Sequence, residues 1–183
     1  MGKKLLILGA GGHGKVVREV ALSLKKNDIS VYEDISFLDD HSSEAIGKIE
    51  SLKEFVGKYD EVICGIGNNA VRKKLLEQAE QIGFCIPVLI HPTAYVSPSA
   101  SVEAGNVVEP KAIVNANSVV EKGCIISVGA IVDHDAVVGE YSHVNAGAIC
   151  KAGSTIEAGR KLEAGEVVLG YGCTVKQLSE QRN

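Results

Sequence analysis

The chain of 183 residues has few aromatic side chains, with no tryptophan, three phenylalanines and five tyrosines. Hydrophobic residues nevertheless make up 45% of the sequence, so a core can form and general disorder is excluded. A core drawn almost wholly from Val, Ile, Leu and Ala favours narrow, regular packing.

The sequence also lacks a basic excess and any long apolar run. Lysine and arginine number 19 against 23 acids, a net charge of −4, which argues against a nucleic-acid partner. No apolar stretch reaches the length of about 18 residues that a membrane helix needs, so no membrane insertion is expected. The start, MGKKLLILGA, lacks the cleavage pattern of a signal peptide, and we expect a cytoplasmic protein.

The sequence has no cysteine pattern typical of a disulfide framework or a C-x-x-C motif. The five cysteines are odd in number, and none lies in C-x-x-C spacing. We expect them to be buried as small hydrophobic residues in a reducing compartment, with a zinc site or a reactive thiol as the lesser alternatives. No metal is therefore expected. The five are Cys64, Cys85, Cys124, Cys150 and Cys173.

Residues 1–90 alternate between strand and helix patterns, which predicts an α/β Rossmann-like domain with a short parallel sheet. The expected strands are 4–9, 30–38, 61–67 and 85–90, and the expected helices are 13–26, about 51–57, and one from Asn68 to a stop at Gly83.

Residues 91–183 follow a different pattern, a repeat of six residues. Every sixth position is aliphatic with two exceptions: Val96, Val102, Val108, Val114, Val120, Ile126, Val132, Val138, Val144, Cys150, Ile156, Leu162, Val168 and Thr174. A small side chain mostly stands two residues before each of these, and glycine recurs three residues after. Such a hexapeptide period predicts a parallel β-helix in which 18 residues form one coil.

A glycine-rich turn links the first strand to the first helix. Gly9, Gly11 and Gly14 have G-x-G-x-x-G spacing, and the helix that follows offers free N–H groups and a positive end to a phosphate. Asp34 lies 20 residues past Gly14, where NAD enzymes keep a ribose-binding acid, so an NAD-dependent oxidoreductase stays an alternative. The expected domain has only about four strands, which make one mononucleotide-binding half, whereas a dinucleotide needs two such halves.

Five segments in order resemble one family. They are GAGGHGKVV (9–17), FLDD (37–40), GIGNNAVRKKL (65–75), IHPTAYVSPSA (90–100) and VDHDAVVGEYSHVNAGAIC (132–150). The family is that of the sialic acid O-acetyltransferases and the bacillosamine-type UDP-amino-sugar N-acetyltransferases, which are left-handed β-helix proteins. The resemblance implies a homotrimer with acetyl-CoA bound between solenoids, a UDP-amino sugar held by the N-terminal domain, and direct acetyl transfer.

Catalytic residues follow from the resemblance and from the repeat. His134 matches the family's general base, and its place two residues past inward Val132 puts it at a corner, pointing outward. Asp135 matches the acid that orients this histidine, while Asp133 is an alternative orienter. A flanking carboxylate raises imidazole basicity and fixes the tautomer.

The resemblance assigns the remaining binding residues as well. His143 and Gly147 match residues near acetyl-CoA, and Ala152, one coil or about 4.8 Å from His134, would offer a backbone N–H to the acetyl carbonyl. His134 and His143 are half a coil apart, so they serve one site only if they come from different chains. The nucleotide-sugar residues are Gly11, Gly12, His13, Asp39, Asp40 and Asn68, with Arg72 as a weaker candidate.

The late repeats depart from the family pattern. They carry Arg160, Lys161 and Glu166 where small residues are usual, and the printed sequence shows no G-V-P-A-type capping segment, so we expect an altered distal CoA site. The sequence as a whole predicts an acetyl-CoA-dependent N-acetyltransferase acting on the 4-amino group of a UDP-linked 4-amino-4,6-dideoxy sugar. The alternatives are O-acetylation of sialic or a related nonulosonic acid, and a non-catalytic nucleotide-sugar binding protein.

Overall fold

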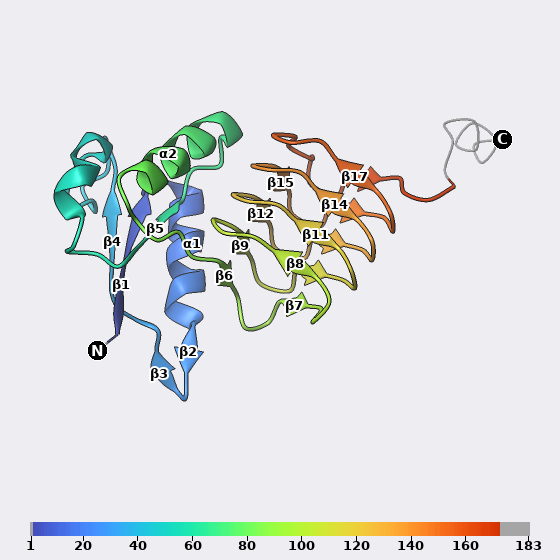
Figure 1. The fold of residues 1–183 in the computed structure, drawn as a ribbon, viewed down its shortest axis with the longest axis horizontal. Helices are drawn as coiled ribbons and strands as arrows, with labels where there is room; N and C mark the ends of the chain where they lie inside the picture. Colours follow the sequence, from blue (N-terminus) through green and yellow to red (C-terminus); the bar gives the residue numbers. More distant parts are fainter. Residues whose placement is uncertain (1, 173–183) are drawn as a thin grey trace.

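The N-terminal part is built around β1 (Lys3–Leu8), in which Leu5 to Leu8 are completely buried. β1 lies between β4 (Tyr32–Leu38) and β5 (Glu61–Cys64), and all three strands run parallel. Figure 1 shows this sheet beside a β-helix in the computed structural model, which describes residues 2–172.

Helices cover both faces of the sheet. Leu5 and Ile7 pack toward α1 (Gly12–Ser23), whereas Leu6 and Leu8 belong to the cluster that contains α2 (Asn69–Gln81) and the 3-10 helix η1 (Ile49–Phe55). This division follows from the two-residue period of a strand, which sends successive side chains to opposite faces. The predicted α/β domain is confirmed.

The prediction of a fourth strand over 85–90 is wrong. Only β6 (Leu89–Ile90) forms, and it pairs with the β-helix strand β9 rather than with the N-terminal sheet; Cys85 makes a single isolated bridge to Glu61. The segment has the composition of a buried strand because it is the first strand of the solenoid. A short hairpin of β2 (Lys25–Lys26) and β3 (Ile29–Ser30) was not predicted.

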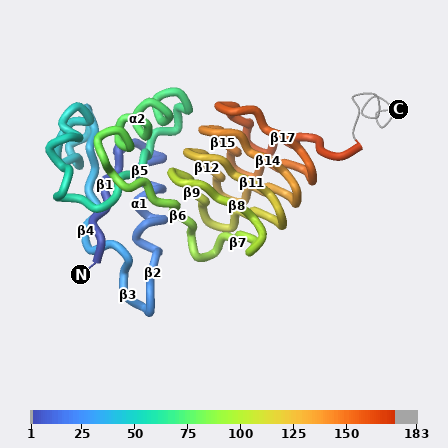
Figure 2. Tube along the Cα trace, viewed as in Figure 1, coloured from blue at the N-terminus to red at the C-terminus, as the bar shows by residue number. Residues whose placement is uncertain are grey.

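The C-terminal part is a parallel β-helix whose coils stack in Figure 2. Its two-residue strands form three parallel sheets in which paired residues are 18 apart, as between Ile113 and Ile131. The first sheet contains β7 (Tyr95–Val96), β10 (Ile113–Val114), β13 (Ile131–Val132), β16 (Ile149–Cys150) and β18 (Val167–Val168). The second contains β8 (Ser101–Val102), β11 (Val119–Val120), β14 (Val137–Val138) and β17 (Thr155–Ile156). The third contains β6, β9 (Val107–Val108), β12 (Ile125–Ile126) and β15 (His143–Val144).

The interior of the β-helix is the column of aliphatic residues that the repeat predicts. From Val108 to Leu162 these positions are at most 1% exposed, and the small residues before them, such as Ala130 and Ala136, are equally buried. Thr174, the last predicted repeat position, lies outside the described residues. The hexapeptide prediction is confirmed for the coils that the structure describes.

The third sheet of the solenoid is covered by the N-terminal part. Its outward residues Leu89 and Val107 join the cluster that contains α1, and Ile125 and His143 are also buried. The predicted domain boundary at residue 90 falls at the end of β6 and stays a prediction.

Three of the described cysteines behave as predicted. Cys64, Cys124 and Cys150 are buried, and burial raises the pKa of Cys64 to about 11 and of Cys124 and Cys150 to about 12. The prediction is wrong for Cys85, which is exposed, and Cys173 lies outside the described residues. Within residues 2–172, no helix is long and apolar enough to span a membrane.

Candidate active site

The glycine-rich turn has two kinds of glycine. A Cβ on Gly14 would lie 2.1 Å from the carbonyl oxygen of Gly9, so Gly14 is required for the turn to pack. A Cβ on Gly11 or Gly12 would meet no atom within 4 Å. Gly11 is the N-cap of α1, and no side chain caps the helix, so its first N–H groups have no capping partner. An anion fits this arrangement.

Asp39 fastens this turn to the FLDD segment. One carboxylate oxygen accepts the N–H of Ala10 at 2.8 Å, and the other accepts those of His41 and Ser42, each at 2.8 Å. These hydrogen bonds lower the pKa of Asp39, and the bond from Ala10 contributes most. Asp40 accepts the N–H of Ile49 at 3.1 Å. Both predicted nucleoside contacts therefore also have internal roles, and Asp39 holds the turn in position.

The NAD alternative gains no support from Asp34. Its carboxylate accepts hydrogen bonds from the hydroxyls of Ser36 at 3.0 Å and Tyr59 at 3.2 Å, within the N-terminal part.

Two histidines from the two parts meet at their interface. The rings of His13 and His143 have centroids 6.3 Å apart. His13 Nδ1 lies 3.4 Å from a carboxylate oxygen of Glu109, whose other oxygen accepts the N–H of Val128 at 2.9 Å. His143 Nε2 lies 2.9 Å from the hydroxyl of Ser127.

Burial governs the charge of His143. The residue is 8% exposed, and burial, with help from His13 and Arg72, lowers its pKa to about 4. Its ring is therefore neutral near pH 7. His143 Nδ1 and His13 Nε2 are buried and have no hydrogen-bond partner among the described residues. Sequence reasoning placed His143 half a coil from His134, but it did not foresee the contact with His13.

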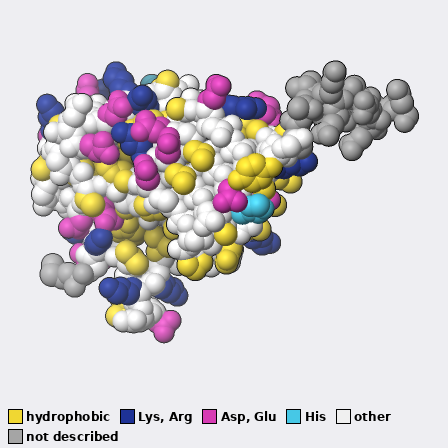
Figure 3. Space-filling view, turned by 45° about the vertical axis from the view of Figure 1, so that its right-hand side comes forward, with side chains coloured by type: hydrophobic (Ala, Val, Ile, Leu, Met, Phe, Trp, Pro, Cys, Tyr) yellow, Lys and Arg dark blue, Asp and Glu magenta, His cyan; other side chains and the backbone are white. Residues whose placement is uncertain are grey.

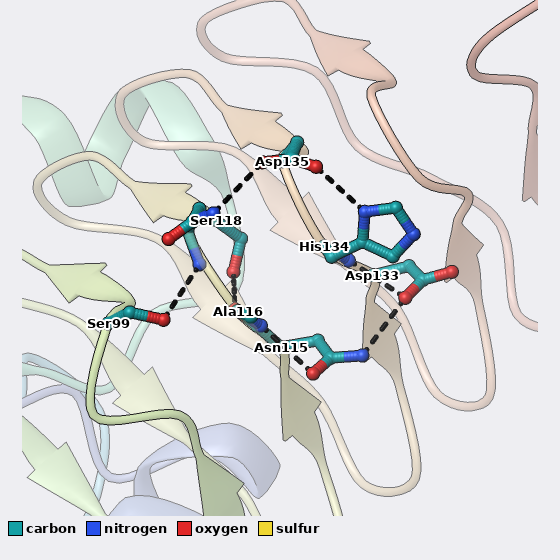
Figure 4. Close-up of polar contacts among 8 residues, drawn as sticks. Ser99, Asn115, Ala116, Ser118, Asp133, His134 and Asp135 are labelled. Atoms are coloured by element: carbon teal, nitrogen blue, oxygen red, sulfur yellow. Dashed lines mark hydrogen bonds and ion pairs between the residues drawn. The ribbon is translucent and has the colours of Figure 1, made fainter.

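His134 lies at an exposed corner after β13. Its Nδ1 is 2.8 Å from a carboxylate oxygen of Asp135, and this hydrogen bond is the main reason that the pKa of His134 is raised. Asp133 instead accepts the backbone N–H of His134 at 2.8 Å. Of the two acids that the sequence left open, Asp135 contacts the ring. In Figure 4 the second ring nitrogen points away from Asp135.

Both acids are held by asparagines one coil earlier. Asn115 donates to Asp133 at 3.0 Å (Figure 4), and Asn117 donates to Asp135 at 3.3 Å. Asp135 also has a φ of 58°, in the left-handed region, which places its side chain at the turn beside the histidine. This stacking of polar residues orients the imidazole before any substrate arrives.

The other predicted acetyl-CoA contacts are exposed or half-buried. Gly147 has a φ of 65° at a corner where a Cβ would meet no atom within 4 Å, so this corner is open to a ligand. Ala152 lies on the coil after His134. The pKa of Asp133 is lowered mainly by the backbone N–H of His134, and the backbone N–H of Ala152 makes the smallest contribution.

The structure brings the predicted residues together in two groups. Gly11, Gly12, His13 and Asp39 lie around the turn, with His143 nearby, whereas His134 and Asp135 follow β13 at another corner of the solenoid. Asn68 caps α2 by accepting the N–H of Val71 at 3.1 Å. Arg72 is buried, not a nucleotide ligand on the surface. Among the described residues, no cluster of His, Cys, Asp and Glu is suited to a metal ion.

Comparisons with known proteins cover both parts of the chain. Residues 4–79 match the family model of the PglD N-terminal domain. A segment of 109 residues is 32% identical to UDP-N-acetylbacillosamine N-acetyltransferase of Bacillus subtilis (strain 168), covering 57% of this chain and 50% of that protein. This match thus spans half the length of the curated relative.

Two solved structures are similar over nearly the whole chain. The acetyltransferase domain of PglB from Neisseria gonorrhoeae FA1090, in complex with acetyl coenzyme A, is 36% identical with a TM-score of 0.81, over 93% of this chain and 92% of that one. A histidine-to-asparagine variant of perosamine N-acetyltransferase from Caulobacter crescentus, in complex with CoA and GDP-perosamine, is 27% identical with a TM-score of 0.81, over 91% and 89%.

By these similarities the chain is a left-handed β-helix protein with a Rossmann-like N-terminal domain. Within that class, the chain belongs to the family of bacillosamine-type amino-sugar N-acetyltransferases.

Proposed function

We propose that the protein transfers the acetyl group of acetyl-CoA to the 4-amino group of a UDP-linked 4-amino-4,6-dideoxy sugar. The observation that carries this proposal is the ring of His134, exposed and hydrogen-bonded to Asp135, in a chain similar throughout to acetyltransferases of amino sugars. A cytoplasmic location remains a prediction.

The proposed chemistry is direct transfer with one base. The free amine attacks the thioester carbonyl, a C–N bond forms, the C–S bond breaks, and the departing CoA thiolate takes up the proton that the base has removed from the amine. The amine proton passes to His134 Nε2 while Nδ1 donates to Asp135, which stabilises the imidazolium. The backbone N–H of Ala152 is proposed to donate to the carbonyl oxygen as it gains charge.

The proposed acceptor site is the turn before α1. The diphosphate would bind the open N–H groups at Gly11 and Gly12, with His13 beside it, and Asp39 and Asp40 would contact the nucleoside. Asn68, the N-cap of α2, would line the side of the proposed acceptor site formed by that helix. Acetyl-CoA would contact His143 and Gly147, and the corner at Gly147 has room for a ligand.

We further propose a homotrimer with sites between copies. His134 lies at a different corner from His13 and His143, so one chain would supply the acceptor site and its neighbour the base. A column of outward apolar side chains crosses the first solenoid sheet, from exposed Tyr95 through half-buried Ile113, Ile131 and Ile149 to exposed Val167. Figure 3 shows apolar side chains gathered on the solenoid. Such a column suits an interface between copies.

A charge in this column is expected to separate the copies. Ile149→Glu should convert the trimer to monomers in light scattering and abolish acetyl transfer, because an interface cannot bury an unpaired carboxylate. The control is Thr155→Glu on the exposed face of β17, which should stay trimeric. A trimeric Ile149→Glu variant would show that this column is not the interface.

The acceptor is tested with a panel of substrates and a thiol reagent that detects free CoA. We expect rapid release with a UDP-linked 4-amino sugar and at least a tenfold lower kcat/KM with GDP-perosamine. The likeness to perosamine N-acetyltransferase makes a GDP-linked amino sugar the second candidate. Release with sialic acid alone would replace N-acetylation by O-acetylation. Nucleotide-sugar binding without release would indicate a non-catalytic binding protein.

A further inference from the structure

Arg72 is a charged side chain buried between the two parts of the molecule. It is 1% exposed, and the five N–H groups of its guanidinium reach six acceptors, so at least one N–H is shared between two of them. All six acceptors are neutral oxygens, and none of the ion pairs among residues 2–172 includes Arg72. Burial lowers its pKa. A buried charge without a carboxylate is costly, so its retention calls for a specific role.

The acceptors of Arg72 come from both parts. On the N-terminal side Nη1 reaches the carbonyls of Ile66 and Gly67, at 3.3 Å and 3.4 Å. On the solenoid side Nε donates to the carbonyl of Gly123 at 2.7 Å, while Nη2 donates to those of Tyr141 at 2.8 Å and Ser142 at 3.2 Å. One planar group thus joins the loop after β5 to two successive coils.

Asn69 extends this contact to a third coil. Its side-chain oxygen accepts from Arg72 Nη2 at 2.8 Å, and its Nδ2 donates to the carbonyl of Gly159 at 2.9 Å. Gly123, Tyr141 and Gly159 occupy equivalent corners 18 residues apart. The first turn of α2 therefore docks along one edge of the solenoid.

Tyr141 departs from the pattern of this edge. Gly105, Gly123 and Gly159 stand at the equivalent corners, whereas Tyr141 has a φ of 55°, which costs a residue with a Cβ about 1 kcal/mol. Its ring is buried over Gly123, where a Cβ would come within 2.4 Å of it, and belongs to the core cluster of α2. The amines of Lys73 and Lys122 lie 5.5 Å and 5.7 Å from the ring centroid.

This contact lies next to the predicted site. Arg72 holds the carbonyl of Ser142, the residue before His143, and His143 faces His13 from the N-terminal part. The orientation of the two parts therefore sets the distance between the acceptor turn and the solenoid.

We propose that Arg72, with Asn69 and Tyr141, forms an interdomain lock in which Arg72 is a positioning residue for acetyl transfer. The lock touches no substrate; it holds the nucleotide-binding turn where the acceptor amine reaches the acetyl group. The existence of the lock stands on its contacts alone, whereas its effect on turnover rests on the proposed function.

The test compares Arg72→Met and Arg72→Lys with Lys74→Met, an exposed lysine of the same helix. Hydrogen exchange should become at least tenfold faster in Arg72→Met at interface segments 122–126 and 140–144, and unchanged at the distal strand β18. The Kd for UDP by calorimetry should stay within twofold of wild type, because the turn lies in the N-terminal part, while kcat falls at least tenfold. Arg72→Lys keeps the charge but not the planar fork, so its effects should be intermediate, and Lys74→Met should match wild type.

Unchanged protection at the interface in Arg72→Met would overturn the lock. Exchange that accelerates at β18 as much as at the interface segments would also overturn it, because it would indicate general destabilisation. If Arg72→Met does not fold, Asn69→Ala removes only the outermost bonds and should accelerate exchange at 158–161 alone; no acceleration there overturns the lock. Loss of protection with normal kcat overturns the positioning role. Absence of transfer by the wild-type protein would contradict the proposed function, while the exchange data would still decide the lock.

Discussion

Replacing His134 by asparagine is expected to lower kcat/KM for acetyl transfer about 10²-fold to 10⁴-fold, the usual contribution of a positioned general base. Asparagine keeps the size and polarity of the corner but cannot take up the proton of the amine. The affinities for acetyl-CoA and UDP, measured by calorimetry, should change little, because asparagine keeps the size of the side chain and the diphosphate is proposed to bind the turn before α1 rather than His134. Near-normal turnover would remove His134 from the mechanism.

The pH dependence of the wild-type protein tests the same assignment. The base must be neutral to act, so kcat/KM should rise with pH through the pKa of His134, which the bond to Asp135 raises above its ordinary value. Asp135→Asn removes the main cause of this shift, so the rise should move to lower pH while the plateau falls about tenfold or more. An unmoved profile in this variant would assign the observed pKa to another group.

Replacing Gly14 by alanine is expected to destabilise the N-terminal part by about 3 kcal/mol or more. The added Cβ would lie 2.1 Å from the backbone oxygen of Gly9, and backbone at both sites would have to move. The measurement is the midpoint of thermal unfolding.

Gly12→Ala is the matched variant in the same turn. Its Cβ meets no atom within 4 Å, and alanine favours a helix over glycine by about 0.5–1 kcal/mol, so stability should hold or rise slightly. The affinity for UDP should nevertheless fall about tenfold, because the methyl group would occupy the space proposed for the diphosphate. An unchanged Kd for UDP would place the diphosphate elsewhere.

The parts of the molecule that sequence predicts well are those built by local repetition. The interior column from Val108 to Leu162 follows from a six-residue period, because each coil contacts only its neighbours. His134 and Asp135 are likewise adjacent in sequence, so their pairing was one of the two that the sequence left open, with Asp133 as the other candidate.

What sequence missed depends on contacts between distant segments. Glu109 reaches His13 across the interface, Asp39 reaches Ala10, and the strand at 89–90 joins the solenoid rather than the sheet. Arg72 did leave a signal. With Leu75, Leu76 and Ala79 it occupies the i, i+3, i+4 and i+7 positions of the buried stripe of α2, where a charge is out of place unless it is paired.

The docking of α2 along the solenoid edge has a consequence for how this architecture can change in length. The first turn of α2 contacts Gly123, Tyr141 and Gly159, which lie at corners spaced one coil apart. Inserting or deleting a coil before Gly159 would move these corners away from their partners on the helix, even though the β-helix itself would tolerate the change. Coils added beyond this point meet no such constraint. Natural or engineered variation in coil number is therefore expected to accumulate on the C-terminal side of Gly159.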